Sequence, residues 1–220
     1  MTIDVRDSYY ADRLGQLRLD DQRAGSAERE LRTIEILSSI LGAQIFSSGQ
    51  ALLDLGCGDQ FLRAGSEARG QVYQGLDIED CDFEKDTFPV LDESIDVALA
   101  YSVIEHLRDP SIFLSECLRV LKPGGFLILE APNWHFSQRG FFDDFTHVRP
   151  YSPHSLCGLL RSFKFDPLLD VPNLRCRSRF AYTNRYRYRL AALRPFSGVT
   201  RFLPEFLTGR ALGMIVIARK

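Results

Sequence analysis

The sequence predicts an α/β fold built on a mainly parallel sheet, because three short apolar runs alternate with stretches of helical spacing. The runs cover residues Ala51–Leu55, 94–101 and 126–129, and their lengths suit strands buried in a sheet. Between them, apolar residues recur every three or four positions, as on helices that bury one face. Strands that alternate with helices in this way pair mainly in parallel.

The first half of the chain is arranged around a glycine turn. Its predicted elements are a helix over 26–41, strands over 51–55 and 71–78, and a short helix over 60–68. Ser26 is expected to cap the first helix. The turn Gly56-Cys57-Gly58 follows the first strand and is the expected position of a ligand, since glycine lets a ligand approach the backbone closely. After residue 78 the chain runs almost directly into residues 81–83, without room for the helix that normally connects parallel strands.

The second half repeats the alternation of strands and helices. Its predicted elements are strands over 94–101, 126–129 and 211–218, and helices that begin after Asp109-Pro110 and after Ser152-Pro153. Proline suits the first turn of a helix, where its missing N–H has no partner in any case. The segment Lys122-Pro-Gly-Gly125 is expected to end the preceding helix.

Composition favours one domain. The 220 residues are 45% hydrophobic and 25% charged, enough to bury a sizeable core. We expect an arm or lid over 1–25, a core over 26–170, a basic insertion over 171–210 and a closing strand over 211–220. The first residues are polar, and no run approaches the ~18 apolar residues of a membrane span, so a cytoplasmic protein is expected. Five widely spaced cysteines favour free thiols over disulfides or zinc.

Three kinds of nucleotide site compete for the glycine turn. A phosphate-binding P-loop needs Gly-Lys-Ser/Thr, which does not follow Gly58. A dinucleotide fingerprint needs a third glycine where Phe61 stands. A nucleoside cofactor without phosphates needs backbone approach at one end and a carboxylate for the ribose at the other, and Asp77 at the end of the second strand meets that need.

The ordered motifs of the chain resemble those of class I S-adenosylmethionine-dependent methyltransferases. The motifs are Leu53-Asp-Leu-Gly-Cys-Gly58, Gly75-Leu-Asp77, Ser94-Ile-Asp-Val97, Val103-Ile-Glu-His-Leu-Arg-Asp-Pro110 and Arg119-Val-Leu-Lys-Pro-Gly-Gly125. The resemblance covers roughly residues 50–165. It implies a doubly wound, Rossmann-like sheet of seven mostly parallel strands with helices on both faces and an antiparallel last strand. It also implies an enzyme that uses S-adenosylmethionine.

The resemblance implies a role for each matching residue around this cofactor. Asp54 would lie near the amino group of the methionyl end, which the turn residues Gly56, Cys57 and Gly58 would hold. Asp77, with Ile78 beside it, would bind the ribose hydroxyls. The remaining cofactor-binding residues are Asp82 and Phe83 against adenine, and Tyr101 and Ser102 below the sulfonium.

Two histidines are candidates for catalysis. Ubiquinone-pathway O-methyltransferases show a Glu-His pair like Glu105-His106, preceded by another acid three positions before the glutamate, and together these can bind a divalent metal. Ser102 stands at that earlier position, so we expect no metal. His106 is then either a general base or a residue at the start of a helix that hydrogen-bonds the backbone. His147 lies in a polar loop with the candidate substrate-binding residues Asp144, Arg149 and Tyr151, and is a candidate base or substrate anchor.

The charge distribution suggests an anionic acceptor. The net charge is −2, but residues 170–220 carry eleven Lys or Arg against two acids, or +9, which leaves −11 for the rest. The Arg/Tyr-rich segment 175–210 suits a phosphorylated, sugar-linked or lipid-linked substrate, or peripheral contact with a membrane surface. Its other interpretation is a solvated lid, and no motif indicates nucleic acid. O-methylation of a small molecule is the favoured function, with a non-catalytic cofactor-binding subunit as the alternative.

Overall fold

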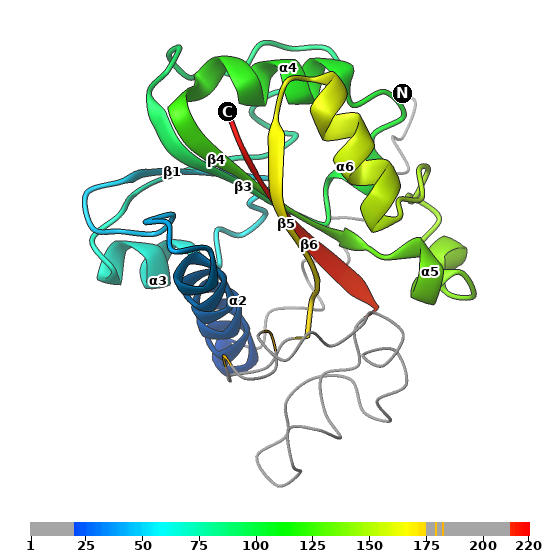
Figure 1. Ribbon diagram of the computed structural model, residues 1–220, viewed down its shortest axis with the longest axis horizontal. Coiled ribbons are helices and arrows are strands. Elements are labelled where there is room, and N and C mark those ends of the chain that lie inside the picture. Colours follow the sequence, from blue (N-terminus) through cyan, green and yellow to red (C-terminus); the bar gives the residue numbers. More distant parts are fainter. Residues whose placement is uncertain (1–19, 175–178, 180–181, 183–211) are drawn as a thin grey trace, which may run out of the picture.

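A computed structural model describes residues 20–174, 179, 182 and 212–220, and these form one α/β unit around a six-stranded sheet (Figure 1). The strand order is β2-β1-β3-β4-β6-β5. The strands are β1 (Ala51–Leu55), β2 (Val72–Leu76), β3 (Ile95–Tyr101), β4 (Leu121–Pro132), β5 (Asp166–Pro172) and β6 (Gly213–Arg219).

Strand directions confirm the predicted fold class. β1 pairs in parallel with β2 and β3, and β3 pairs in parallel with β4. β6 lies between β4 and β5 and is antiparallel to both. The last apolar run of the chain is therefore the antiparallel closing strand that the resemblance implied.

The described part of the chain has six strands where seven were expected. Residues 77–94 link β2 to β3 through turns, in which the amide of Cys81 donates to the carbonyl of Asp77 and that of Asp86 to the carbonyl of Asp82. A further parallel strand would need a crossover of a dozen or more residues in addition to the strand itself. The short connection noted in the sequence thus removes one strand, and β2 becomes the sheet edge, with Val72 64% exposed.

Helices cover both faces of the sheet, as predicted (Figure 1). The helices are α2 (Asp20–Leu41), α3 (Arg63–Ala68), α4 (Ser111–Val120), α5 (Trp134–Ser137) and α6 (Pro153–Ser162), with 3-10 turns η1 (Ile104–His106) and η2 (Phe141–Asp143). Because successive strand residues point to opposite faces, Leu52 packs with the α2 side chain Ile34, whereas Leu53 belongs to the core that includes Phe113 of α4 and Leu156 of α6.

The helix ends agree in part with the sequence signals. Ser152 and Ser155 form a reciprocal capping box at the start of α6, with Pro153 in the first turn as predicted. Ser26 is not a cap, because α2 already begins at Asp20 and Ser26 lies inside it. α3 begins at Arg63, slightly later than expected.

Several other expectations concern thiols, membranes and the two ends of the chain. The described cysteines Cys57, Cys81, Cys117 and Cys157 are free and buried, as expected. None of the described helices is long and apolar enough to cross a membrane. Most of the expected arm over 1–25 and of the basic insertion over 171–210 lies outside the described residues.

Candidate active site

The glycine turn at the end of β1 is a tight backbone structure. Gly56 and Gly58 have φ angles of +74° and +52°, in the left-handed region that favours glycine. A Cβ atom added to Gly56 would lie 2.4 Å from Cγ2 of Val103. The amides of Gly56 and Cys57 donate to the carbonyl of Leu76 at 2.8 and 3.2 Å, which fixes the turn against the end of β2.

The Cys57 side chain fills the space under this turn. A Cβ added to Gly75 of β2 would lie 2.7 Å from its sulfur, so the two positions are packed closely. Burial, together with the nearby charges of Asp54 and Asp77, raises the pKa of the Cys57 thiol to about 12. Cys57 is therefore a neutral packing residue, and its predicted contribution to the cofactor site comes from its backbone.

Asp77 joins the turn to the end of β2. Its Oδ2 accepts a hydrogen bond from the amide of Gly58 at 2.5 Å, and its Oδ1 accepts one from the amide of Ile78 at 2.7 Å. Each carboxylate oxygen has a second lone pair, so both can still accept a ribose hydroxyl. Ile78 is 49% exposed beside it and offers an apolar surface at the same edge.

Asp54 lies beneath the turn, where burial changes the pKa of its carboxyl group. Its Oδ2 accepts a hydrogen bond from the Tyr73 hydroxyl at 2.6 Å, and the residue is buried. Burial is the main cause that raises the pKa of Asp54 to about 7, and the charge of Asp77 adds to it, while the Tyr73 hydroxyl opposes it. A cationic amino group placed nearby would favour the charged carboxylate.

Asp82 and Phe83, the predicted adenine contacts, have different surroundings. The Asp82 carboxylate stabilises its own turn, since Oδ1 accepts from the Glu84 amide at 2.9 Å and Oδ2 from the Lys85 ammonium at 2.5 Å. The Phe83 ring is buried and packs against Phe88 at a centroid distance of 5.5 Å. Their contact with adenine stays a prediction.

The residues around the turn fit S-adenosylmethionine. Gly56 leaves no room for a Cβ atom, which fits a backbone cradle, and the carboxylates of Asp54 and Asp77 suit an ammonium group and a ribose diol. They would hold this cofactor at the carboxyl edge of the sheet, where ligands of parallel α/β folds bind.

The end of β3 carries local strain. Ser102 has φ +51°, unusual for a residue other than glycine. Its amide donates to the Glu130 carbonyl at 3.0 Å, and its hydroxyl donates to the Glu130 carboxylate at 3.1 Å. Tyr101 has a buried hydroxyl without a hydrogen-bond partner among the described residues, and burial raises its pKa well above the usual value. Strained backbone positions such as Ser102 concentrate at functional sites.

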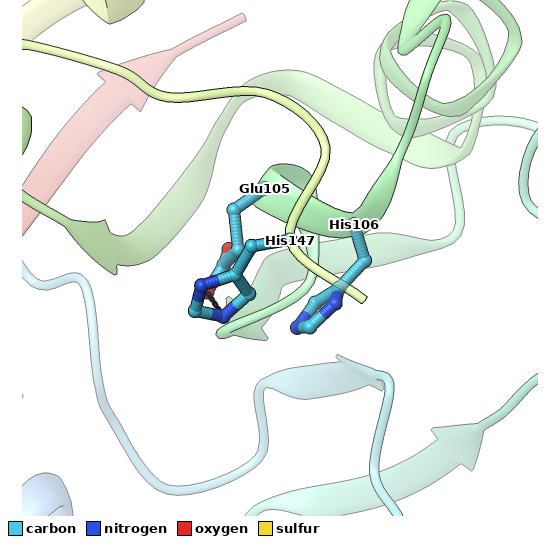
Figure 2. A group of neighbouring side chains, drawn as sticks. All are labelled: Glu105, His106 and His147. Carbon is cyan, nitrogen blue, oxygen red and sulfur yellow. Dashed lines mark ion pairs between the residues drawn. The ribbon is translucent and has the colours of Figure 1, made fainter. Parts of the chain in front are cut away.

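A second group of residues forms beyond β3, where η1 meets the loop that precedes α6 (Figure 2). The carbonyl of Glu105 accepts hydrogen bonds from the amides of Val148 and Arg149 at 2.9 and 3.0 Å. These bonds hold the loop on η1 and place the rings of His106 and His147 4.8 Å apart between centroids. The structure thus brings both predicted catalytic histidines together.

In both histidines Nδ1 is hydrogen-bonded to the backbone or side chain of a neighbouring residue. Nδ1 of His147 lies 2.6 Å from the carbonyl oxygen of Phe141, which can only accept, so Nδ1 carries the proton. Nδ1 of His106 lies 3.0 Å from Oγ1 and 3.2 Å from the carbonyl oxygen of Thr146. Because the Thr146 hydroxyl donates to Asp144, Nδ1 of His106 also acts as a donor. With Nδ1 as the donor, Nε2 is the nitrogen without a proton in the neutral tautomer of each ring.

Glu105 completes this group of side chains. It is 1% exposed, and neither carboxylate oxygen makes a hydrogen bond of regular geometry within the described chain, although the Ser102 side chain is close enough to oppose the rise of its pKa. Nε2 of His147 lies 4.0 Å from Glu105 Oε1 and 3.9 Å from Asp144 Oδ2. Burial and the charge of Glu130 raise the pKa of Glu105 well above its usual value. We call Glu105, His106 and His147 the Glu-His-His cluster.

The predicted substrate-binding residues divide between this cluster and its surroundings. Asp144 belongs beside it, since one carboxylate oxygen accepts from Thr146 and the other approaches His147. Arg149 points to the surface and donates to the carbonyl of Arg108 at 3.1 Å. Tyr151 is 4% exposed and packs in the core beside Leu156 of α6. Contact of these residues with a substrate stays a prediction.

Sequence reasoning treated Glu105 only as the neighbour of His106 and did not single out Thr146. An acid inside the apolar segment Val103-Ile-Glu-His-Leu107 is a signal for a buried carboxyl group. The expectation of no metal counted only residues near Ser102, whereas the loop supplies His147 from about 40 residues further along the chain.

Comparisons with known proteins agree with this architecture. Residues 59–129 match a family described as a methyltransferase domain. A ubiquinone biosynthesis O-methyltransferase from Bradyrhizobium sp. is 32% identical over 104 residues, which cover 39% of this chain and 41% of that protein. The chain spans less than half the length of the curated relatives it matches.

Solved structures share the fold. A Haloferax volcanii methyltransferase, in complex with the Trm112 methyltransferase activator, has a TM-score of 0.59 and 17% identity and covers 100% of this chain and 99% of its own. An S-adenosylmethionine-dependent methyltransferase from Archaeoglobus fulgidus has a TM-score of 0.53 and 20% identity and covers 87% of this chain and 94% of its own. With the strand order, these likenesses show that the chain has the fold of these methyltransferases, and residues 59–129 match the methyltransferase domain family.

Proposed function

We propose that this protein transfers the methyl group of S-adenosylmethionine to an oxygen atom of a small acceptor. The observation that carries the proposal is the Glu-His-His cluster, which brings two imidazoles and a buried carboxyl group together. The cluster lies beside the glycine turn, Asp54 and Asp77, which we call the cofactor edge. The two sites adjoin through Val103, which packs on Gly56 and precedes η1 by one residue. Both lie at the carboxyl ends of neighbouring parallel strands, β1 and β3.

The chemistry asks little of the protein beyond positioning and proton removal. When bound, S-adenosylmethionine would supply a methyl group on a sulfonium, so that an acceptor oxygen would gain the methyl carbon and the carbon–sulfur electron pair would return to sulfur. In the proposed site the cluster holds the acceptor hydroxyl. The proton of that hydroxyl passes either to Nε2 of a histidine or to a ligand that the cluster binds. Positioning and proton transfer are the two contributions expected here.

Oxygen as the acceptor atom is supported by several observations together. The matched Bradyrhizobium sp. relative is an O-methyltransferase by name. A hydroxyl group must lose a proton during transfer, and the two histidines provide sites for it. Phe142 and Phe145, on the same loop as His147, are 58% and 56% exposed and would offer apolar contact to the acceptor. The basic segment 175–210 supports an anionic, sugar-linked or lipid-linked acceptor by its charge.

Two measurements in sequence test this function. Calorimetry should detect binding of S-adenosylmethionine, and absence of binding would reject both the enzyme and a non-catalytic cofactor-binding subunit. Labelled cofactor is then incubated with a panel of phenols, sugars, carboxylic acids and amines. Transfer to hydroxyl compounds that is lost in the His147→Ala variant is the expected result. Transfer only to amines, or binding without any transfer, would overturn the proposal.

A further inference from the structure

We propose that the Glu-His-His cluster is a binding site for a divalent transition-metal ion such as Zn²⁺, Mn²⁺ or Co²⁺. One atom from each of Glu105, His106 and His147 can be chosen so that all three lie within 4.8 Å of one another. Glu105 and His106 belong to η1, His147 belongs to the loop that precedes α6, and the three side chains lie next to one another (Figure 2). The inference concerns metal binding, and it stands independently of the methyl transfer.

The hydrogen bonds behind the two imidazoles are those of metal ligands. A histidine that binds a metal usually donates its other ring N–H to a carbonyl or carboxylate, which fixes the ring and its tautomer. Nδ1 of His147 donates to the Phe141 carbonyl at 2.6 Å, and Nδ1 of His106 donates to Thr146. Thr146 is itself held by Asp144. Both Nε2 atoms are therefore oriented before any ion arrives.

Glu105 supplies the second, independent observation. A buried carboxyl group without a hydrogen-bond partner is costly, and native structures rarely leave one unexplained. Neither Glu105 oxygen makes a hydrogen bond of regular geometry within the described chain, although the residue is only 1% exposed. A bound cation would neutralise the carboxylate and occupy its lone pairs, which gives this residue a function that packing alone does not.

The donor set selects the kind of ion. Two imidazoles and one carboxylate suit Zn²⁺ and its neighbours, whereas Mg²⁺ and Ca²⁺ prefer oxygen ligands. In a tetrahedral site with bonds of about 2.1 Å, ligand atoms lie about 3.4 Å apart, so side-chain rotation must bring the ligand atoms closer by up to about 1.4 Å. Three protein ligands leave a fourth position open. If the proposed function holds, an acceptor oxygen would bind there and lose its proton more readily.

Metal titration of the full-length protein tests the site without cofactor or acceptor. The protein is stripped with a chelator and titrated with Zn²⁺ by calorimetry and with Co²⁺ by visible absorption. One ion per chain and cobalt d–d bands are expected. His147→Ala and Glu105→Gln should each weaken the binding of Zn²⁺ by at least roughly 100-fold. Thr146→Val, which removes the hydroxyl that contacts His106 and donates to Asp144 but leaves all three proposed ligands in place, should weaken it about tenfold.

Matched controls make the outcome decisive. His135→Ala and His154→Ala remove exposed histidines outside the cluster, and both should bind Zn²⁺ like the wild type. Circular dichroism of each variant shows whether it folds. Should Glu105→Gln fail to fold, the cobalt spectra of the wild type and His147→Ala still decide. Zn²⁺ affinity unchanged in His147→Ala, a wild-type spectrum without cobalt bands, or preference for Mg²⁺ over Zn²⁺ would each overturn the proposal.

Discussion

The cofactor edge and the Glu-His-His cluster lie next to each other but consist of different chemical groups. The cofactor edge is mainly backbone: a glycine turn whose amides and φ angles are fixed by Leu76 and Asp77. The cluster is mainly side chains from two segments about 40 residues apart, held by hydrogen bonds to backbone carbonyls. The first depends on the shape of one turn, and the second on how two loops meet.

This difference indicates how the cofactor edge and the Glu-His-His cluster each respond to substitution. At a turn where a Cβ atom would clash, an added methyl group forces the backbone or the neighbouring side chain to shift. A cluster of side chains can lose one member and keep its backbone, so its loss affects chemistry or metal binding before it affects folding. Substitutions on each side should therefore have separable effects on cofactor binding and on turnover.

The largest effect is expected from Gly56→Ala. The new Cβ atom would lie 2.4 Å from Val103 in a backbone with φ +74°, so the turn must move. Binding of S-adenosylmethionine should be lost, and the left-handed backbone alone should lower stability by about 1–3 kcal/mol. Calorimetry with the cofactor and thermal unfolding measure the two effects.

Gly124→Ala is the matched control for this substitution. Gly124 has φ +79°, but a Cβ atom added there has no neighbour within 4 Å. It should lose stability on the order of 1 kcal/mol and bind the cofactor like the wild type. Equal cofactor affinities for the two variants would mean that the turn is not the cradle.

A smaller and different effect is expected from His147→Ala. Loss of this imidazole should lower kcat for the acceptor by about 10²–10⁴-fold, because a proton acceptor or its support is removed. Cofactor affinity should change little, since the glycine turn stays intact. His154→Ala, an exposed histidine of α6, serves as the control and should keep wild-type kcat. If His147→Ala weakened cofactor binding and His154→Ala did not, the two sites would not be separable.

The sequence predicted the arrangement of the glycine turn and Asp77 better than that of the cluster, for a physical reason. The residues of the turn are neighbours in the chain, and the end of β2 follows from parallel pairing of adjacent strands. The Glu105–His147 approach depends on the amides of Val148 and Arg149 meeting one carbonyl, a long-range contact that no local pattern encodes. The missing seventh strand could be anticipated from the short 77–94 connection, whereas burial of Tyr151 required knowing how α6 packs.

Within the cofactor edge, Asp54→Asn tests whether the buried carboxyl group titrates. The pKa of Asp54 rises from the ordinary 3.8 to about 7 in the folded state, so the folded state holds the proton more tightly. Its contribution to stability is complete below pH 3.8 and is lost as the pH rises to 7, by roughly 4 kcal/mol. Urea unfolding of both apo proteins at several pH values should show this slope in the wild type only. Glu105 is present in both, so it cancels in the difference. Parallel pH profiles would contradict the raised pKa.

The smallest effect is expected from Tyr73→Phe, which removes the hydroxyl that donates to Asp54 at 2.6 Å. The loss should cost about 1–2 kcal/mol, and more at pH 8 than at pH 5, because the ionised carboxylate is the stronger acceptor. The matched measurement repeats the substitution in the Asp54→Asn background. There the cost should shrink and lose its pH dependence, since an amide oxygen carries no charge. An equal cost in both backgrounds would mean that Tyr73 stabilises the end of β2 by packing, and that the electrostatics of the cofactor edge rest on Asp54 and Asp77 alone.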